Sequence, residues 1–219
     1  MELVRIDTQR AYERLWEKIT TCELAPGASI DPGQLAEDLG MSLTSVREAI
    51  WLLARENLVL VTPRHGLYVA EVSIPDLEYL SELRLPLESQ AARLAAQRAA
   101  ADDLVVLETL RAEQAHVPAE DARRLFDLDH KFHQAVTRAA QNRYLAQTLE
   151  HLFGLSRRLW YLALPQLGFL PTSVEQHLDL VEAIKARDSD RAEQVMHGHV
   201  QDFYDKVRAI LYRGPGSGG

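Results

Sequence analysis

Apolar residues recur at helical spacing along most of this chain, and this period limits the fold more than any other feature of the sequence. Six segments of this kind follow one another in the second part of the chain. They lie near residues 75–100, 101–115, 119–140, 142–164, 172–187 and 188–212. Each such helix must bury its apolar stripe against another element. Residues 73–213 therefore predict an antiparallel bundle of six helices.

The helical period is interrupted once, by a short strand period near the start of the chain. Helices are expected near residues 8–21, 32–39 and 42–56, followed by a β-hairpin over 58–69 with its turn at 63–66. Asp31 and Pro32 suit the start of the second helix, and Gly40 suits its end. Three short helices followed by a hairpin is the layout of a winged helix-turn-helix, whose third helix enters the major groove of DNA.

The chain therefore divides into two predicted domains, and its fold class is mainly α. We place a winged helix-turn-helix, a DNA-binding domain, at residues 1–72 and the helical bundle at 73–213. Residues 214–219 are rich in glycine and predict a flexible tail.

The charge balance narrows the possible partners. The chain has 24 Lys and Arg against 32 Asp and Glu, a formal net charge of −8. Proteins that coat nucleic acid or bind anionic lipid are usually basic, so both roles are disfavoured. Residues 1–70 hold seven Lys and Arg against ten Asp and Glu, a net charge of −3. A protein that reads one short site remains possible, and we expect its DNA binding to be modest, salt-sensitive and dependent on dimerisation.

The cysteine count and the lack of long apolar stretches indicate the cellular compartment. Cys22 is the single cysteine, so no disulfide can form within the chain and a reducing environment fits. No apolar run follows a basic start, and no uncharged apolar stretch is long enough to span a bilayer. We expect a cytoplasmic protein with no signal peptide and no membrane segment.

The predicted third helix and the hairpin turn hold the candidate DNA contacts. Apolar residues of that helix face inward, which leaves hydroxyl groups and one arginine near its N-terminal end, where they suit phosphates and base edges. The candidates are Ser42, Thr44, Ser45 and Arg47 on the helix, and Arg64, His65 and Gly66 at the turn. The alternative is an ordinary capped surface helix with a solvated arginine.

Four polar residues lie on the inward stripes of three bundle helices. Asp129 and His133 are four residues apart and so share one helix face, while His177 and His199 lie on the apolar stripes of two later helices. A single histidine on such a stripe is usually a hydrogen-bonded core residue, but four buried polar groups all need partners. A divalent cation would satisfy them together, and this ligand set suits zinc, nickel, manganese or iron. Around a metal that takes six ligands, two positions would remain for water or a carboxylate.

The N-terminal residues resemble the GntR family of bacterial transcription regulators. The matching motifs are Leu24–Gly27, Gln34–Gly40, Ser42–Ile50, Glu56–Val59 and Gly66–Val69. Two positions depart from the family pattern: Leu43 stands where an arginine is usual, and Asn57 where glycine is common. The first departure removes one usual DNA contact, so the operator is expected to differ from the common family site.

The C-terminal residues resemble the FCD ligand-binding domain of the FadR subfamily, over about residues 74–212. The matching positions include Leu83–Arg84, Leu87–Glu88, Asp129, Phe132–His133, Asn142, His177 and His199. The resemblance implies a helical bundle that holds a metal through an Asp and three His and binds a small organic acid beside it. All four ligand positions are filled, by Asp129, His133, His177 and His199. The count of six helices is similar to the VanR-like branch.

The resemblance also implies an effector site. Arg84 matches an arginine that often faces the effector, and its alternative role is an ion pair with Glu88. Arg157 and Tyr161 lie on a helix that could line the same cavity, where an arginine would suit an anionic ligand.

Three functions remain in competition. The favoured one is a metabolite-responsive repressor that binds double-stranded operator DNA as a homodimer and responds to a small carboxylate effector. The second is a metal-dependent enzyme using the Asp and three His, although no general base is evident. The third treats the bundle as a dimerisation domain only, in which the four polar residues satisfy each other.

Overall fold

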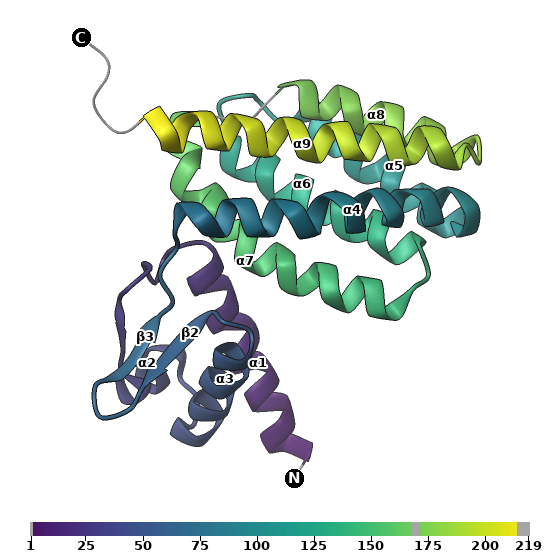
Figure 1. Cartoon of the computed structure of the whole chain (residues 1–219). Coiled ribbons are helices and arrows are strands. Elements are labelled where there is room, and N and C mark those ends of the chain that lie inside the picture. Colours follow the sequence, from purple (N-terminus) through teal and green to yellow (C-terminus); the bar gives the residue numbers. More distant parts are fainter. Residues whose placement is uncertain (1, 168–170, 214–219) are drawn as a thin grey trace. The chain divides into compact units, whose positions relative to one another are not determined.

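The computed structural model describes residues 2–167 and 171–213, and these form two compact units. The first unit contains the residues up to Ser73 together with Gly154–Leu162, and the second contains Ile74–Phe153 and the residues from Ala163 onward. The described residues are mainly helical (Figure 1). The predicted tail at 214–219 lies outside the described residues.

The first unit is a winged helix-turn-helix. Its elements are α1 (Glu2–Thr20), β1 (Ser29–Ile30), α2 (Pro32–Leu39), α3 (Leu43–Arg55), β2 (Val59–Thr62) and β3 (Gly66–Val69). The first helix begins earlier than the expected residue 8. The three strands form one antiparallel sheet in the order β1-β3-β2, with Ser29 opposite Tyr68 and Leu60 also opposite Tyr68. Strand β1 was not predicted, because two residues are too short to show a period.

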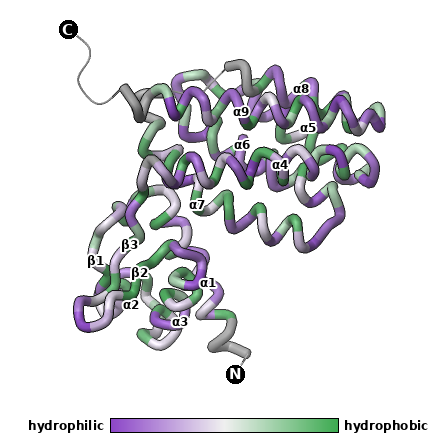
Figure 2. Tube along the Cα trace, in the orientation of Figure 1, coloured by the Kyte–Doolittle hydropathy of each residue, from purple (hydrophilic) through white to green (hydrophobic). Residues whose placement is uncertain are grey.

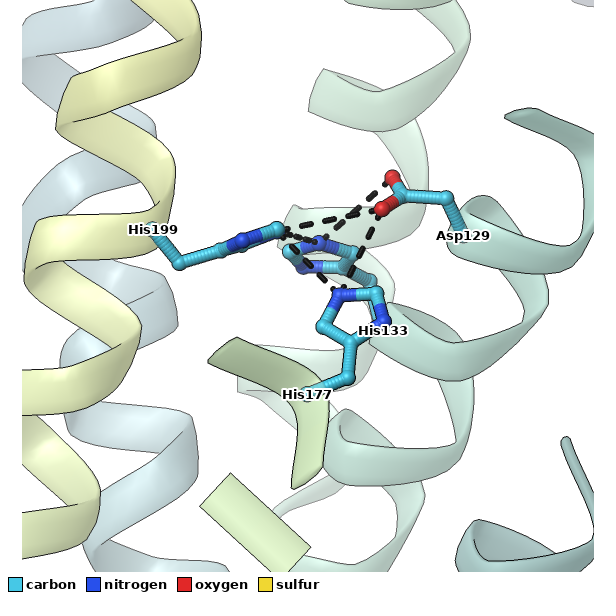
Figure 3. Close-up of side chains that lie close together, drawn as sticks. All are labelled: Asp129, His133, His177 and His199. Carbon is cyan, nitrogen blue, oxygen red and sulfur yellow. Dashed lines mark hydrogen bonds and ion pairs between the residues drawn. The ribbon is translucent and has the colours of Figure 1, made fainter. Parts of the chain in front are cut away.

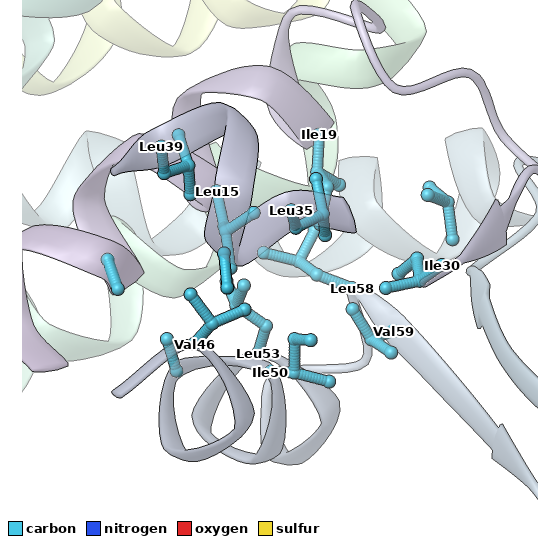
Figure 4. Packing of buried hydrophobic residues seen from close by; sticks show 14 residues of the cluster. Leu15, Ile19, Ile30, Leu35, Leu39, Val46, Ile50, Leu53, Leu58 and Val59 are labelled. Carbon is cyan, nitrogen blue, oxygen red and sulfur yellow. The ribbon is translucent and has the colours of Figure 1, made fainter. Parts of the chain in front are cut away.

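One apolar core holds this unit together (Figure 4). It is built from the inward faces of the three helices and the adjoining ends of the sheet. Its members include Leu15, Ile19, Leu35, Val46, Ile50, Leu53, Leu58 and Val59, each at most 8% exposed. The helix spacing of these residues confirms that the apolar period of the sequence marked the buried faces.

Local signals fix both ends of α2 as predicted. The Asp31 carboxylate accepts from the backbone N–H of Gly33 and Gln34, at 2.7 and 3.2 Å, and so caps α2. Gly40 ends that helix at φ 63°, in the left-handed region that glycine enters without strain. Asn57 has φ 60°, which explains how asparagine can replace the family's usual glycine there, since it tolerates this region.

Six helices follow the winged helix-turn-helix, as predicted, and they build the second unit apart from residues 154–162, which belong to the first. They are α4 (Ile74–Arg98), α5 (Ala101–His116), α6 (Ala122–Ala139), α7 (Arg143–Leu167), α8 (Pro171–Lys185) and α9 (Ser189–Arg213). Helices α4 and α9 lie side by side and run antiparallel (Figure 1). Helix α7 continues past Pro165, where a break was expected. A proline in a last helical turn removes only one backbone hydrogen bond, so the turn persists.

Hydrophilic and apolar residues are interspersed along the bundle helices (Figure 2), and α6 has the most pronounced apolar face among them. On α6 the apolar stripe includes Leu128, Phe132 and Val136, each at most 3% exposed. Asp129 and His133 lie on that same stripe, so the period that buries the core also buries these two polar side chains.

Candidate metal centre and DNA-reading helix

Four polar side chains from three helices meet inside the bundle (Figure 3). Asp129 and His133 come from α6, His177 from α8 and His199 from α9, and none is more than 5% exposed. One potential ligand atom from each residue lies within 4.8 Å of all the others. The structure therefore brings together the four residues that the sequence singled out.

The Nε2 atoms of the three histidines point at one another and at the carboxylate. The Nε2 of His199 lies 2.9 Å from that of His133 and 3.3 Å from that of His177. Asp129 Oδ1 lies 3.4 Å from His177 Nε2 and 3.8 Å from His199 Nε2, and its Oδ2 lies 3.7 Å from His133 Nε2. The four groups thus surround one small space.

The other ring nitrogen of each histidine, Nδ1, has its own acceptor outside this group. The acceptors are Glu88 Oε2 for His133, Gln114 Oε1 for His177 at 2.8 Å, and Gln176 Oε1 for His199 at 3.0 Å. A neutral imidazole carries one proton, and these acceptors hold it on Nδ1. The Nε2 lone pairs then face each other at hydrogen-bond distance, an arrangement that needs a proton or a metal cation between them.

The carboxylate of Asp129 gives a second reason to expect a cation. Asp129 Oδ1 has no hydrogen-bond partner among the described residues. Burial raises the pKa of Asp129 to about 6, although His133 and Arg84 partly oppose this. One bridging proton between two imidazoles would not satisfy this oxygen, whereas a divalent cation would satisfy all four groups together. The residues therefore fit a metal.

The histidines differ in their protonation. Burial, together with the neighbouring imidazoles, lowers the pKa of His177 well below its ordinary value, and burial and His133 lower that of His199 to about 3. Burial acts in the same direction on His133, but Glu88 and Asp129 outweigh it and raise its pKa. His177 and His199 are therefore neutral near pH 7, the form in which an imidazole binds a metal.

Arg84 lies next to this group rather than in open space. Its guanidinium pairs with Glu88 at 2.7–2.8 Å, donates to the Tyr204 hydroxyl at 3.3 Å and sits 4.7 Å from the centre of the Phe153 ring. Burial alone would raise the pKa of Glu88, but Arg84 and His133 hold it at about 2. The ion pair with Glu88 is thus present, and an effector contact for Arg84 stays a prediction.

Arg157 and Tyr161, the other two predicted effector residues, belong to the first unit. Arg157 forms two hydrogen bonds with the Glu17 carboxylate, at 2.6 and 3.0 Å, and one with Thr20. Its guanidinium also lies 5.4 Å from the ring centres of Trp16 and Tyr161. The structure does not place these two residues in the Asp/His group, and their role as effector contacts stays a prediction.

Helix α3 presents most of the predicted DNA contacts. Thr44 and Arg47 are exposed near its N-terminus, beside the exposed Leu43. Ser42 caps the helix, its hydroxyl accepting from the Ser45 backbone N–H at 3.1 Å. The expectation that Ser45 is exposed was wrong: it is 1% exposed, and its hydroxyl hydrogen-bonds with that of Ser42 at 2.9 Å.

The hairpin forms the wing, and its tip is open to solvent. Thr62 pairs with Gly66, and Arg64 and His65 between them are exposed. The turn is held by the backbone N–H of His65, which donates to the Thr62 carbonyl at 3.0 Å, and by the Tyr68 hydroxyl, which donates to the His65 carbonyl at 2.8 Å. The predicted wing residues are therefore placed where a DNA groove could reach them.

The residues around the Asp/His group that sequence reasoning missed are Gln114 and Gln176. A single glutamine on a helix has no spacing signal, and its role depends on which neighbour the fold supplies. Glu88 was read only as the partner of Arg84, and its second oxygen, which binds His133, was not foreseen.

A winged helix-turn-helix followed by a helical bundle with a buried Asp and three His is the layout of a DNA-binding transcription regulator with a second, helical domain. The comparisons agree with this class. Residues 7–69 match the family described as bacterial regulatory proteins, gntR family, and residues 79–202 match the FCD domain. The chain therefore belongs to the GntR family, as a regulator with an FCD domain.

Curated relatives match along nearly their whole length. The HTH-type transcriptional repressor RspR of Escherichia coli K12 is 29% identical over 203 residues, covering 92% of this chain and 89% of the relative. The HTH-type transcriptional regulator McbR of the same strain is 30% identical over 217 residues, covering 94% and 93%. The solved structure of E. coli McbR/YncC superposes with a TM-score of 0.82 at 25% identity, covering 94% of this chain and 98% of that one.

These matches decide between the regulator and the enzyme hypotheses. They are transcription regulators, which confirms the regulator hypothesis over the enzyme alternative. Within the part of the chain that the structure describes, no helix has a long, apolar, nearly uncharged stretch suited to crossing a bilayer.

Proposed function

We propose that this protein is a repressor whose FCD domain binds one divalent metal through Asp129, His133, His177 and His199, and binds a small carboxylate effector beside it. The observation that carries the metal is the convergence of three Nε2 atoms on a buried carboxylate oxygen that has no hydrogen-bond partner among the described residues. Three nitrogen donors and one oxygen donor suit zinc, nickel, manganese or iron. When bound, the metal would supply a positive centre for an acid.

The proposed DNA contacts are the exposed residues of α3 and the wing, namely Ser42, Thr44, Arg47, Arg64, His65 and Gly66. We propose that two copies bind a pseudo-palindromic operator as a homodimer, since each copy presents one recognition helix and the first 70 residues are not basic. A regulator of this kind acts where the chromosome is, so we place it in the cytoplasm. Repression is supported by the relative RspR, which is named a transcriptional repressor.

The effector is proposed to be an anion. Of the candidate effector contacts, Arg84 lies nearest to the proposed metal ligands. This arginine is 4% exposed and linked through Glu88 to His133, so a ligand that engages it also affects the metal ligands. For regulation, the effector must bind the DNA-competent and DNA-free states with different affinity.

The test is operator binding by the full chain. Fluorescently labelled DNA from the region upstream of the protein's own gene is titrated with wild-type protein, with and without small mono-, di- and tricarboxylic acids, in metal-buffered and chelated solution. We expect sequence-selective binding that at least one acid changes, and only when metal is present.

Two variants of α9 form a matched pair for this test. His199→Ala removes a proposed ligand, and His197→Ala removes an exposed histidine two residues away. We expect the first to abolish the response to acid and the second to keep it. Binding with no sequence preference under every condition would overturn the regulator, and an acid response that survives chelation and His199→Ala would overturn the metal's part in it.

A further inference from the structure

Each histidine of the proposed metal site is held from behind by a side chain on a different element. The outer acceptors, as we name Glu88, Gln114 and Gln176, come from α4, α5 and α8. Glu88 and Gln114 are each 1% exposed, and Gln176 is half-buried. Each hydrogen-bonds to Nδ1, and in the neutral imidazole, the form that binds a metal, this contact holds the single proton on Nδ1 and leaves Nε2 without one.

The orientation of Gln176 is fixed by chemistry. Its amide nitrogen donates to Asp202 Oδ2 at 2.8 Å, and an ionised carboxylate can only accept hydrogen bonds. The NH₂ group of Gln176 must therefore face Asp202, which leaves the amide oxygen to face His199 Nδ1. An exposed aspartate thus sets the tautomer of a buried histidine through one glutamine.

Glu88 is fixed in a comparable way from the opposite side. One oxygen pairs with Arg84 at 2.7–2.8 Å and the other binds His133 Nδ1. A carboxylate behind an imidazole makes it a stronger donor to a metal than an amide does. The arginine balances the negative charge, which would otherwise be buried without a partner.

Resting on the proposed metal site, we propose that Glu88, Gln114 and Gln176 are positioning residues that hold the three histidines in the Nδ1–H tautomer. Asp202 acts through Gln176 as part of the same arrangement. The four ligands alone do not define the site, and changes at residues that never touch the metal weaken its binding.

The experiment measures the affinity of the full chain for Zn²⁺ by competition with a chromogenic chelator. Gln176→Leu should weaken Zn²⁺ binding by roughly 10–100-fold. Glu88→Gln should act in the same direction, but it leaves Arg84 buried without its charge partner and can impair folding. The half-buried Gln176 therefore carries the decisive measurement.

Asp202 offers a graded series on the protein surface. Asp202→Asn puts an amide, which can either accept or donate, in place of a carboxylate that only accepts, so the orientation of Gln176 is no longer fixed. Part of the population should then turn its NH₂ group toward His199, and Zn²⁺ binding should weaken, but less than in Gln176→Leu. Asp202→Glu keeps an acceptor and should retain nearly wild-type affinity. Asp205→Asn is the control on the same helix, because Asp205 accepts from Gln201 at 3.0 Å and from Arg208 at 2.8 Å, and neither contact is to a histidine.

A second readout reports the tautomers directly. In ¹⁵N NMR spectra of the metal-free protein, His177 and His199 should carry their proton on Nδ1, and Gln176→Leu should move part of the His199 population to Nε2–H. Unchanged Zn²⁺ affinity in Gln176→Leu, or an Nε2–H form of His199 in the wild type, would overturn this inference. A wild-type protein that binds no Zn²⁺ would instead overturn the proposed metal site.

Discussion

Single residues decide how the two functional regions are built. In the Asp/His group, the Nδ1 atom of each histidine lies at hydrogen-bond distance from a side chain outside the group, and we propose that these three side chains hold the proton there. Helix α3, the proposed DNA-reading helix, begins at one hydroxyl, that of Ser42, which hydrogen-bonds with both the backbone N–H and the side chain of Ser45. In both regions, a hydrogen bond to a buried polar side chain holds that side chain in one orientation.

Removal of the Ser42 cap should reduce stability. Ser42→Ala deletes the acceptor for the Ser45 N–H and leaves the buried Ser45 hydroxyl without its 2.9 Å partner. We expect the free energy of unfolding in urea to fall by about 1 kcal/mol. Thr44→Ala, at an exposed position in the first turn of the same helix, serves as the control and should change it little.

Leu43 tests the departure from the family pattern. Its side chain is 39% exposed at the start of α3, so an arginine there could reach a phosphate. Leu43→Arg should tighten operator binding and steepen the plot of log affinity against log salt by about one.

The control for this substitution lies on the same helix. Leu52 is 38% exposed at the other end of α3, and Leu52→Arg adds the same charge away from the DNA-reading end. An equal gain from both variants would show that overall charge, rather than position, determines the affinity.

The residue scale also shows what the sequence could and could not predict. Asp129, His133, His177 and His199 were predicted because burial follows the helical period, and a polar residue on an apolar stripe stands out. Ser45 was misplaced because a small hydroxyl fits either face of a helix. The outer acceptors were missed because their partners come from other helices, which no spacing reveals.

At the scale of elements, the ends of a helix can be predicted from the residues at those ends, whereas contacts between elements cannot. The caps at Asp31 and Gly40 were predicted from residue type alone, and the structure confirms both. The strand β1 escaped notice because its two residues pair only once β3 is beside them. Residues 154–162 of α7 belong to the first unit, although their sequence reads as part of one continuous helix.

Replacing glycine with alanine should have opposite effects on the free energy of unfolding at Gly40 and at Gly198. An added Cβ would meet nothing within 4 Å at either position, so the two substitutions differ only in their effect on the backbone. Gly40 has φ 63°, and Gly40→Ala should lower the free energy of unfolding by about 1 kcal/mol. Gly198 lies inside α9, and Gly198→Ala should raise it by about 0.5–1 kcal/mol. Urea unfolding of both variants checks the pair, and equal signs would contradict the backbone argument.

At the scale of the whole molecule, the charge of −8 and the buried metal site act on different properties. From the charge we expect DNA binding to depend on a few placed contacts, while the proposed metal would link three helices of the bundle. The six helices of this part of the chain were predicted from the helical period, since helical segments with short connections have few ways to bury their apolar faces. The assignment of residues 154–162 to the first unit was not predicted.

Metal removal should destabilise the protein by mass action. With free Zn²⁺ at 100 times its dissociation constant, the free energy of unfolding should be higher by about 2.7 kcal/mol than in the chelated protein. Thermal and urea unfolding in metal-buffered and chelated solution measure this difference. The same experiment on His133→Ala should show almost none, and an undiminished difference there would place the metal elsewhere.

The most direct test of the proposed metal site is the metal content of the protein purified without chelator or imidazole. Elemental analysis of the wild type, His199→Ala and His197→Ala compares a proposed ligand with an exposed histidine on the same helix. The site formed by Asp129, His133, His177 and His199 predicts one divalent metal per chain in the wild type and in His197→Ala, and little in His199→Ala. Equal metal content in all three proteins, or none in the wild type even after Zn²⁺ is supplied, would contradict it.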